Sequence, residues 1–155
     1  MMRVAVCSDE SYPVHEVVCR LLEARGHGIR RFGAVLSGEE QPWALVAEQA
    51  ALAVAGGAVD EGIFFCWSGT GICMAANKVH GVRAALCSDP GQVRAARIWN
   101  HANVLCLSNR TLSDDMAKEL LLAWFETEPG TEGAAGVEVL RAVDARHRGA
   151  IEEGR

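Results

Sequence analysis

Short apolar runs alternate with longer amphipathic segments along almost the whole chain. The apolar runs cover residues 3–7, 28–32, 62–65, 82–87 and 103–107. They are nearly continuous hydrophobic stretches, which is typical of parallel strands covered on both faces. Amphipathic segments, predicted as helices, cover residues 13–25, 42–55, 72–78, 91–99, 113–126 and 136–147. The alternation predicts a doubly wound α/β domain, with a five-stranded parallel sheet between two layers of helices.

A turn-rich segment separates this predicted domain from the end of the chain. Residues 128–133 read Glu-Pro-Gly-Thr-Glu-Gly, a composition typical of a linker. We therefore expect one domain over residues 1–127. A linker and a C-terminal helix and tail follow over residues 128–155 and pack on the same subunit or on a partner.

Composition narrows the classes of function. The 155 residues carry 15 Lys and Arg against 20 Asp and Glu, a formal net charge of −5, and no basic stripe. Nucleic acid is therefore not an expected partner. No apolar run approaches the roughly 20 residues of a membrane-spanning helix, and the first residues have the pattern of a strand rather than of a signal peptide. We expect a cytoplasmic protein without a membrane partner.

The cysteines and histidines show no metal-binding pattern. Six cysteines fall within apolar runs, and no two have the Cys-x-x-Cys spacing of zinc or redox motifs. Most of them are expected to be small core residues, and no metal site is expected. The histidines form no readable pairing with the cysteines. His15 and His27 are expected on the surface of the first α/β unit.

One loop is the strongest candidate site, because it leaves a predicted buried strand and carries a thiol. Residues 66–71 read Cys-Trp-Ser-Gly-Thr-Gly, and Gly69 and Gly71 leave backbone N–H groups unobstructed near the start of a helix. The loop is not a dinucleotide fingerprint, since Met74 takes the third glycine's place, and it is not a Walker loop, since no Gly-Lys-Ser/Thr follows. Cys66 is a nucleophile or proton-transfer base, or else a buried thiol at the end of a strand.

Other polar residues follow neighbouring strands. In an open parallel sheet, ligands bind beyond the carboxyl ends of the strands. Asp9 and Glu10 follow the first strand, and Arg110 follows the fifth. Asp9 is a ligand contact or a helix cap, and Arg110 is a ligand contact or part of a surface ion pair. Asn100 and His101 precede the fifth strand, so they reach this crevice only from a partner subunit or through a bend.

Three sequence blocks follow one another in an order that is specific to one family. They are residues 69–78 (Gly-Thr-Gly-Ile-Cys-Met-Ala-Ala-Asn-Lys), 81–87 (Gly-Val-Arg-Ala-Ala-Leu-Cys) and 103–107 (Asn-Val-Leu-Cys-Leu). Residues 4–9, Arg110 and residues 116–124 fit in the same register. Over residues 3–127 the chain thus resembles the ribose-5-phosphate isomerase B and galactose-6-phosphate isomerase family. The resemblance implies a Rossmann-like fold, a homodimer with its site at the subunit interface, and cofactor-free aldose–ketose isomerisation of a sugar phosphate through a cis-enediolate.

The resemblance also implies the residues that carry the chemistry. Cys66 matches the family cysteine that moves a proton between C1 and C2 of the sugar. Ser68 stands at a family threonine that assists proton transfer between the oxygens. The amides of Gly69, Thr70 and Gly71 would stabilise the enediolate, as catalysis next to a carbonyl requires.

Three further residues match family positions that hold the substrate. Asp9 matches an aspartate that contacts the sugar hydroxyls. Asn100 matches a substrate-binding asparagine. Arg110 matches an arginine that binds phosphate.

The chain departs from the family pattern at several of these positions. Glu10 replaces a histidine that holds the sugar or phosphate, and Trp67 replaces a glycine. Trp99 stands where the family has the histidine that opens the sugar ring, and His101 stands at an aspartate. Residues 133–136 (Gly-Ala-Ala-Gly) lack the Arg-His pair that grips phosphate. Trp67 and Trp99 are expected to be walls of the site that stack on the sugar. His101 either replaces the ring-opening base or makes only local contacts.

These departures favour a short or open-chain sugar. Glu10 beside Arg110 disfavours a dianionic phosphate, and loss of the ring-opening histidine disfavours a cyclic substrate. A tetrulose 4-phosphate cannot close a five-membered ring, because its O4 is esterified. Two alternatives remain open, a non-catalytic sugar or sugar-phosphate binding protein on the same fold and a related sugar epimerase.

Overall fold

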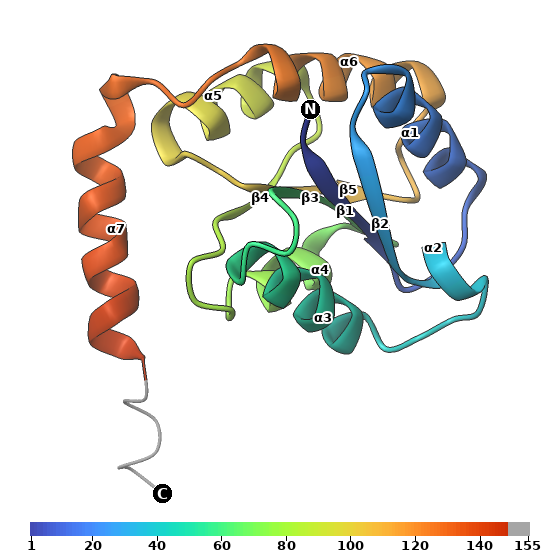
Figure 1. The fold of residues 1–155 in the computed structure, drawn as a ribbon, viewed down its shortest axis with the longest axis horizontal. Coiled ribbons are helices and arrows are strands. Elements are labelled where there is room, and N and C mark those ends of the chain that lie inside the picture. Colours follow the sequence, from blue (N-terminus) through green and yellow to red (C-terminus); the bar gives the residue numbers. More distant parts are fainter. Residues whose placement is uncertain (149–155) are drawn as a thin grey trace, which may run out of the picture.

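Five parallel strands form one sheet in the order β2-β1-β3-β5-β4. The computed structural model describes residues 1–148, so the end of the expected tail lies outside the described residues (Figure 1). The strands are β1 (Arg3–Ser8), β2 (Gly28–Gly33), β3 (Glu61–Cys66), β4 (Ala84–Leu86) and β5 (Val104–Ser108). All five predicted strands are confirmed, and only β4 is markedly shorter than predicted.

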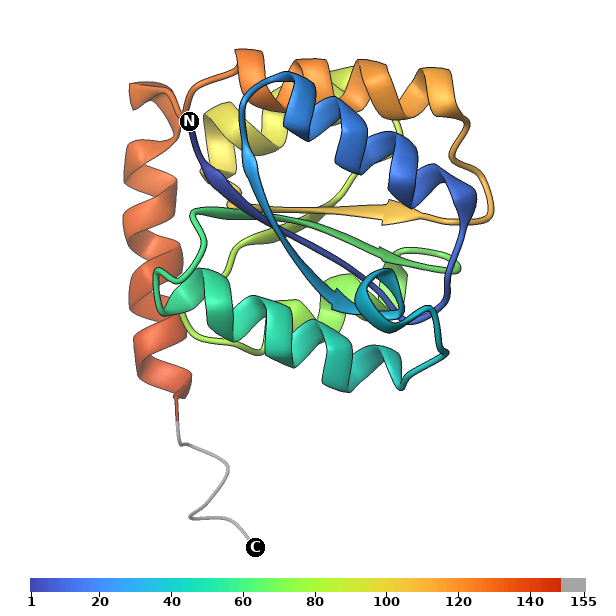
Figure 2. The same ribbon diagram turned by 45° about the vertical axis from the view of Figure 1, so that its right-hand side comes forward.

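Helices cover both faces of this sheet, which confirms the predicted three-layer fold (Figures 1 and 2). One layer consists of α1 (Pro13–Ala24), α5 (Pro90–Asn100) and α6 (Asp114–Glu126). The other consists of α2 (Ala34–Ser37), α3 (Trp43–Ala55) and α4 (Thr70–Ala76). The single turn α2 was not predicted, because four residues are too few to show a helical period.

Two apolar clusters form the core, one on each face of the sheet. Val6, Phe65 and Leu105 point toward α1, α5 and α6, where Trp124 is the largest buried side chain. Phe64 points to the opposite face of the sheet, where the second cluster lies. In this cluster α3 contributes the small residues Ala47, Ala50 and Ala51. These small residues let α3 lie close to the sheet.

The ends of the helices follow the signals in the sequence. Pro13 occupies the first turn of α1, and Gly26 follows that helix with a φ of 81°. Ser113 Oγ accepts a hydrogen bond from the Met116 N–H at 3.1 Å and so caps α6. Asp89 caps α5 in the same way by accepting from the Gln92 N–H at 3.0 Å. These caps fix where each helix begins and ends.

A buried ion pair holds the amino edge of the sheet. The Arg97 guanidinium lies 2.7 Å from a carboxylate oxygen of Glu61, and the Trp124 indole N–H donates to the other oxygen at 2.6 Å. Arg97 also donates to the Ala102 and Thr127 carbonyls at 2.8 and 3.1 Å. One arginine therefore joins β3, the end of α5 and the segment that follows α6.

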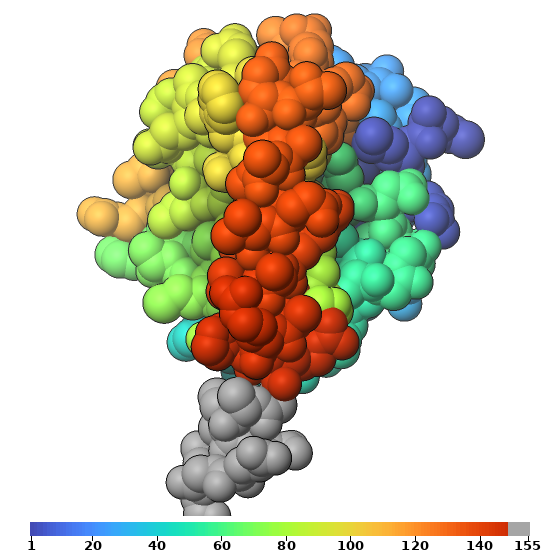
Figure 3. All heavy atoms as spheres, turned by 90° about the vertical axis from the view of Figure 1, so that its left-hand side faces the viewer, coloured from blue at the N-terminus to red at the C-terminus, as the bar shows by residue number. Residues whose placement is uncertain are grey.

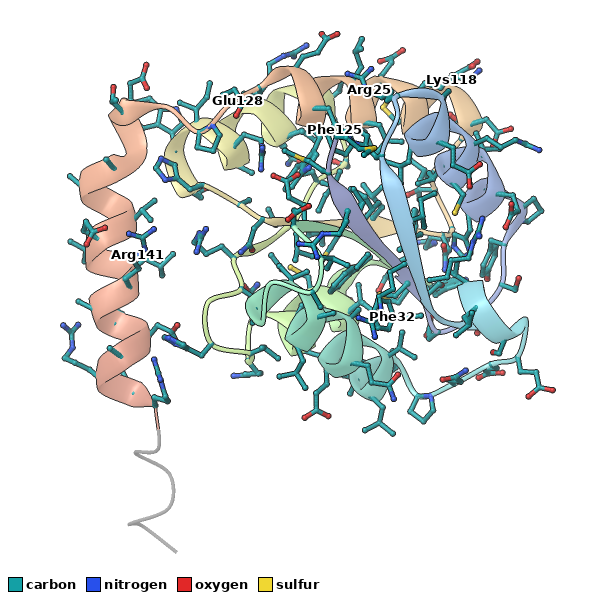
Figure 4. The ribbon with its side chains drawn as sticks, viewed as in Figure 1. Arg25, Phe32, Lys118, Phe125, Glu128 and Arg141 are labelled. Atoms are coloured by element: carbon teal, nitrogen blue, oxygen red, sulfur yellow. The ribbon has the colours of Figure 1, made fainter. Side chains whose placement is uncertain are left out.

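The C-terminal helix α7 (Ala134–His147) lies along one side of the domain, after the 3-10 turn η1 (Thr131–Gly133). It packs against α5 and η1, and Figure 3 shows it crossing the α5 end of the molecule. Figure 4 labels Arg141 on α7, beside a groove of ≈ 800 Å³ that separates the helix from the segment joining α4 to β4. Among the helices of residues 1–148, none is long and apolar enough to cross a membrane.

Candidate active site

The order of the strands places the switch point of the sheet, where a crevice is expected, between the carboxyl ends of β1 and β3. From β1 the chain continues to β2 on one side, and it later returns to β3 on the other side. Ligands of doubly wound sheets bind at such a switch point. Ser8 pairs with Phe65, so the next residues, Asp9 and Cys66, leave neighbouring strands side by side. The structure thus brings together two of the predicted site residues.

The loop from Cys66 to Gly71 is anchored to the end of β5. The Cys66 side chain is only 5% exposed and packs in the core cluster that faces α3 and α4. The Asn109 N–H donates to the Cys66 carbonyl at 2.9 Å, and the Arg110 N–H donates to the Trp67 carbonyl at 3.1 Å. Ser108 Oγ donates to the same Trp67 carbonyl at 2.9 Å. Three hydrogen bonds therefore fix the main chain at the start of the loop.

The two glycines of the loop are required by close contacts. Gly69 has a φ of 78°, and a Cβ there would lie 2.6 Å from Leu86 Cδ1. A Cβ at Gly71 would lie 3.1 Å from the Trp43 ring, so this tryptophan packs against the loop. The helix α4 begins at Thr70, two residues earlier than predicted. Gly69 is therefore the N-cap of α4, and Thr70 and Gly71 are its first two residues.

Two hydroxyl groups lie next to each other in this loop. Ser68 Oγ and Thr70 Oγ1 are 2.7 Å apart, within hydrogen-bonding distance. Each hydroxyl can donate or accept a proton. The pair can therefore pass a proton between two neighbouring oxygen atoms of a ligand.

Acidic side chains surround the end of β1. The Glu10 N–H donates to Asp9 Oδ1 at 3.0 Å, and the Tyr12 hydroxyl donates to Glu10 Oε2 at 2.9 Å. Burial raises the pKa of Asp9, and the nearby carboxylates of Glu10 and Glu40 raise it further. This end of the crevice thus offers acceptors suited to hydroxyl groups and repels anions.

Arg110 lies on the other side of the loop, over the Trp67 ring. The distance from Arg110 Cζ to the ring centroid is 4.6 Å, which is a cation–π contact. Arg110 also borders a cavity of ≈ 340 Å³ beyond the ends of β4 and β5. The polar side chains that line this cavity are Ser68, Ser88, Gln92, Ser108, Arg110 and Thr111.

The structure contradicts the prediction of a surface position for His15. Its side chain is 2% exposed, and its Nε2 lies 2.7 Å from Asn109 Oδ1. The Asn109 amide donates in turn to Ser8 Oγ at 3.1 Å. The prediction was wrong because α1 turns the face that carries His15 toward the sheet, where the imidazole packs on Phe65 with the ring centroids 4.6 Å apart.

The remaining predicted site residues lie at the opposite edge of the sheet. Trp99 and Asn100 end α5, just before β5 begins. His101 caps this helix with a φ of 46°, and its Nε2 lies 2.8 Å from the Gly130 carbonyl. Its own carbonyl accepts from Arg83 Nε at 2.8 Å. Within one chain, these three residues do not reach the crevice between β1 and β3.

Several contacts at the site were missed in the sequence. Tyr12 was missed although it lies two residues from Glu10, because only the folded turn brings its hydroxyl to that carboxylate. Trp43 was missed because its contact with Gly71 joins segments 28 residues apart. The position of Asn109 between Ser108 and Arg110, at a strand end, was a usable signal for a role at the site. Within residues 1–148, no three His, Cys, Asp or Glu side chains are grouped as ligands of a metal ion.

Comparisons with known proteins show which family this chain is similar to. The chain is 39% identical over 133 residues to ribose-5-phosphate isomerase B of Escherichia coli K12, covering 85% of this chain and 88% of that protein. It is 32% identical over 136 residues to D-erythrulose-4-phosphate isomerase of Pectobacterium atrosepticum, covering 87% and 90% of the two chains.

Solved structures show the same fold. The Clostridium thermocellum ribose-5-phosphate isomerase B superposes with a TM-score of 0.88 at 31% identity, over 94% of this chain and 99% of that one. The type B ribose 5-phosphate isomerase of Trypanosoma cruzi superposes with a TM-score of 0.87, also at 31% identity and over the same shares. The family model described as Ribose/Galactose Isomerase matches residues 4–140. The predicted family and fold are therefore confirmed, and the chain belongs to the ribose/galactose isomerase family.

Proposed function

We propose that this protein is a cofactor-independent aldose–ketose isomerase of sugar phosphates, with a preference for a short, open-chain substrate. The observation that carries the proposal is the placement of Asp9 and Cys66 on neighbouring strands at the switch point, in front of the loop from Cys66 to Gly71. Named relatives act on ribose 5-phosphate and erythrulose 4-phosphate, which supports the reaction type.

Cys66 is the proposed base. As a thiolate, its Sγ removes a proton from the carbon next to the carbonyl group, and the C–H electron pair forms the C=C bond of a cis-enediolate. The resulting thiol returns the proton to the former carbonyl carbon, so the carbonyl group moves by one position.

The loop after Cys66 stabilises the enediolate. Backbone N–H groups between Gly69 and Gly71 donate to the oxygen that gains negative charge, and removing one such donor typically costs about 10²–10³ in rate. The paired hydroxyls of Ser68 and Thr70 pass the remaining proton between O1 and O2. Asp9 accepts hydrogen bonds from the other hydroxyl groups of the sugar.

The charges at the site favour a short sugar. Arg110 is the proposed phosphate ligand, and Glu10 stands on the β1 side of the crevice, where its negative charge disfavours a phosphate held there. His101 is bound to the Gly130 carbonyl at the other edge of the sheet of its own chain. A tetrulose 4-phosphate needs no ring opening, so it suits a site without a dedicated histidine at position 99.

We further propose a homodimer that completes the site. Trp99 and Asn100 lie at the amino edge of their own sheet, so a partner subunit is the route by which they reach the crevice. Large apolar side chains are exposed on both edges, and such patches indicate subunit contacts. They include Trp43, Trp67, Met74 and Trp99, with exposures of 46%, 52%, 61% and 55%.

The proposed compartment is the reducing cytoplasm. All six cysteines are unpaired, and five of them are buried in the core. Free thiols of this kind persist where glutathione and thioredoxin keep them reduced.

Solvent deuterium exchange tests the proposed reaction. The wild-type protein is incubated in D₂O with erythrulose 4-phosphate, ribose 5-phosphate or the unphosphorylated sugars, and product and deuterium are followed by NMR. We expect carbonyl migration with deuterium at the carbon that receives the proton, fastest for the tetrulose phosphate. Cys66→Ala should abolish both signals, whereas Cys73→Ala, which alters a partly exposed thiol on α4, should retain them.

Three results would contradict the proposal. Binding of sugar without exchange would identify a binding protein. Exchange with inversion at one carbon and no carbonyl migration would identify an epimerase. Turnover by Cys66→Ala at the wild-type rate would remove the thiol from the mechanism.

A further inference from the structure

A buried imidazole is hydrogen-bonded to the segments that leave β1 and β5. His15 is in the first turn of α1 and is 2% exposed. Its Nδ1 accepts a hydrogen bond from the Tyr12 N–H at 3.3 Å, and its Nε2 lies 2.7 Å from Asn109 Oδ1. A backbone N–H can only donate, so Nδ1 carries no proton and the neutral ring carries its proton on Nε2. Nε2–H therefore donates to Asn109.

The side chain of Asn109 continues this network in one fixed orientation. Because its Oδ1 accepts from His15, its Nδ2 is the donor to Ser8 Oγ at 3.1 Å. All three side chains are buried, with exposures of 0% for Ser8, 2% for His15 and 7% for Asn109. Loss of His15 or of Ser8 would leave one buried polar atom of Asn109 without its partner, and loss of Asn109 would take one hydrogen bond from each of the other two side chains.

The network joins the two loops that meet at the crevice. The main chain of Asn109 donates to the Cys66 carbonyl at 2.9 Å, so this residue holds the start of the glycine loop. Ser8 directly precedes Asp9, and Tyr12, held by His15, donates its hydroxyl to Glu10. Every link from the imidazole thus leads to a segment with a residue of the proposed site.

We propose that His15 is a positioning residue of the active site, which fixes the Cys66 loop relative to the Asp9 loop through Asn109 and Ser8. The proposal rests on the proposed function, in which Cys66 and Asp9 act on one substrate. A purely apolar side chain would fill the same space, since Phe65 and the core residues of α1 surround the ring. The polar network is thus not needed for packing. All of its hydrogen bonds connect residues at or just after the carboxyl ends of β1 and β5.

Loss of the network should affect catalysis more than substrate binding. With leucine at position 15, Asn109 has no partner for its Oδ1. Asn109 is then held less firmly, and so is the Cys66 carbonyl that accepts from its N–H. A misplacement of about 1 Å can cost about 100-fold in rate, so we expect kcat of His15→Leu to fall about 10- to 100-fold. KM should change less, because the hydroxyl and phosphate ligands remain.

Three variants test this split between kcat and KM. His15→Leu removes both hydrogen bonds, whereas His15→Gln keeps an amide N–H that can donate to Asn109 and should restore most of kcat. His27→Leu is the matched control, because His27 also accepts a backbone N–H through Nδ1, from Met2 at 3.3 Å, but at the amino edge of the sheet. It should leave kcat unchanged. If His15→Leu does not fold, Asn109→Ala replaces it and should lower kcat in the same way.

A second readout does not depend on activity. Alkylation of Cys66 by iodoacetamide, followed by mass spectrometry of its peptide, should be several-fold faster in His15→Leu than in the wild type and in His27→Leu. A folded His15→Leu protein with wild-type kcat and wild-type Cys66 reactivity would overturn the proposal. If the wild type isomerises no sugar phosphate, the proposed function fails, and the alkylation rates alone decide whether His15 positions the loop.

Discussion

Arg110 contacts Trp67 twice, through its side chain and through its main chain. The guanidinium lies over the indole ring at 4.6 Å, and the Arg110 N–H donates to the Trp67 carbonyl at 3.1 Å. The arginine is thus held by the residue that follows Cys66, and the two side chains form one wall of the site. A planar guanidinium stacked on a ring keeps its N–H groups at the edge, where they can bind a phosphate.

The first prediction concerns this arginine. Arg110→Gln should raise KM for a sugar phosphate about 10-fold or more, because a charge-assisted hydrogen bond is worth roughly 1.5–3 kcal/mol. KM for the same sugar without its phosphate should not change. Steady-state kinetics with both substrates measure the difference. Arg20→Gln, an exposed change on α1, is the matched control, and an equal effect of both variants would remove Arg110 from the phosphate site.

The second prediction concerns Glu10 and substrate length. Glu10→Gln removes a negative charge from the crevice while the Tyr12 hydroxyl can still donate to the side chain. We expect the ratio of kcat/KM for ribose 5-phosphate to that for erythrulose 4-phosphate to rise several-fold. Parallel assays of the two substrates measure this ratio. A fall in the ratio would show that Glu10 binds the longer sugar rather than repelling its phosphate.

The fold could be predicted from the sequence because its signals are local. Continuous apolar runs such as Ile63 to Cys66 require cover on both faces, and this requirement already implies a parallel sheet. Caps such as Ser113 act within a single turn. The strand β2 lies at the edge of the sheet and is partly exposed, and it carries Arg30 and Arg31. It was predicted as a strand mainly because it stands between two helical segments in the alternating pattern.

The candidate site could be predicted only where it lies at strand ends. Asp9, Cys66 and Arg110 follow buried strands, and strand pairing brings them to one edge. The burial of His15 could not be predicted, because its bond to Asn109 joins residues 94 positions apart. The separation of His101 from this edge follows from α5 returning to the amino side before β5, which the sequence analysis did indicate.

The third prediction concerns the buried pair of Glu61 and Arg97. Their side chains are 10% and 4% exposed, so removing one partner leaves an uncompensated charge in the core. Glu61→Gln or Arg97→Met should each lower the free energy of unfolding by about 3–5 kcal/mol. The double variant Glu61→Leu/Arg97→Met should cost less than the sum of the single changes. Urea denaturation followed by tryptophan fluorescence measures these values, and additive losses would contradict a coupled pair.

The fourth prediction concerns pH and His15. Burial lowers the pKa of this imidazole, although the Asn109 bond and the nearby Glu16 oppose the shift. The folded state therefore holds the neutral ring, and this contribution to stability is lost as the pH falls below the ordinary histidine pKa of about 6.5. As the pH falls below about 6.5, the free energy of unfolding should fall by up to about 1.4 kcal/mol per pH unit from this group.

A matched pair of variants isolates the His15 contribution. His27 also has a pKa lowered by burial, with the positive N-terminus and Arg25 as further causes, but it is more exposed. His15→Gln should flatten the acid limb of the stability curve more than His27→Gln does. Urea titrations at several pH values measure the slopes. Equal slopes in the wild type and in His15→Gln would show that His15 is not the group that titrates.

The last prediction concerns the backbone of the glycine loop. Gly69 and Gly38 both have positive φ values, 78° and 74°, so alanine at either position carries a similar strain of about 1–2 kcal/mol. A Cβ at Gly38 meets no atom within 4 Å, whereas a Cβ at Gly69 would lie 2.6 Å from Leu86 Cδ1 and 3.0 Å from the Leu107 carbonyl carbon. Only Gly69→Ala must therefore move the loop.

We expect Gly69→Ala to be somewhat less stable than Gly38→Ala and far less active. Displaced amides can no longer meet the enediolate, so Gly69→Ala should lose about 10²–10³ in kcat, while Gly38→Ala stays near the wild type. Chemical denaturation and steady-state kinetics on the same preparations separate the two effects. A Gly69→Ala protein with wild-type kcat would mean that the amides between Gly69 and Gly71 do not stabilise the charge, because their displacement is forced by the backbone of β5.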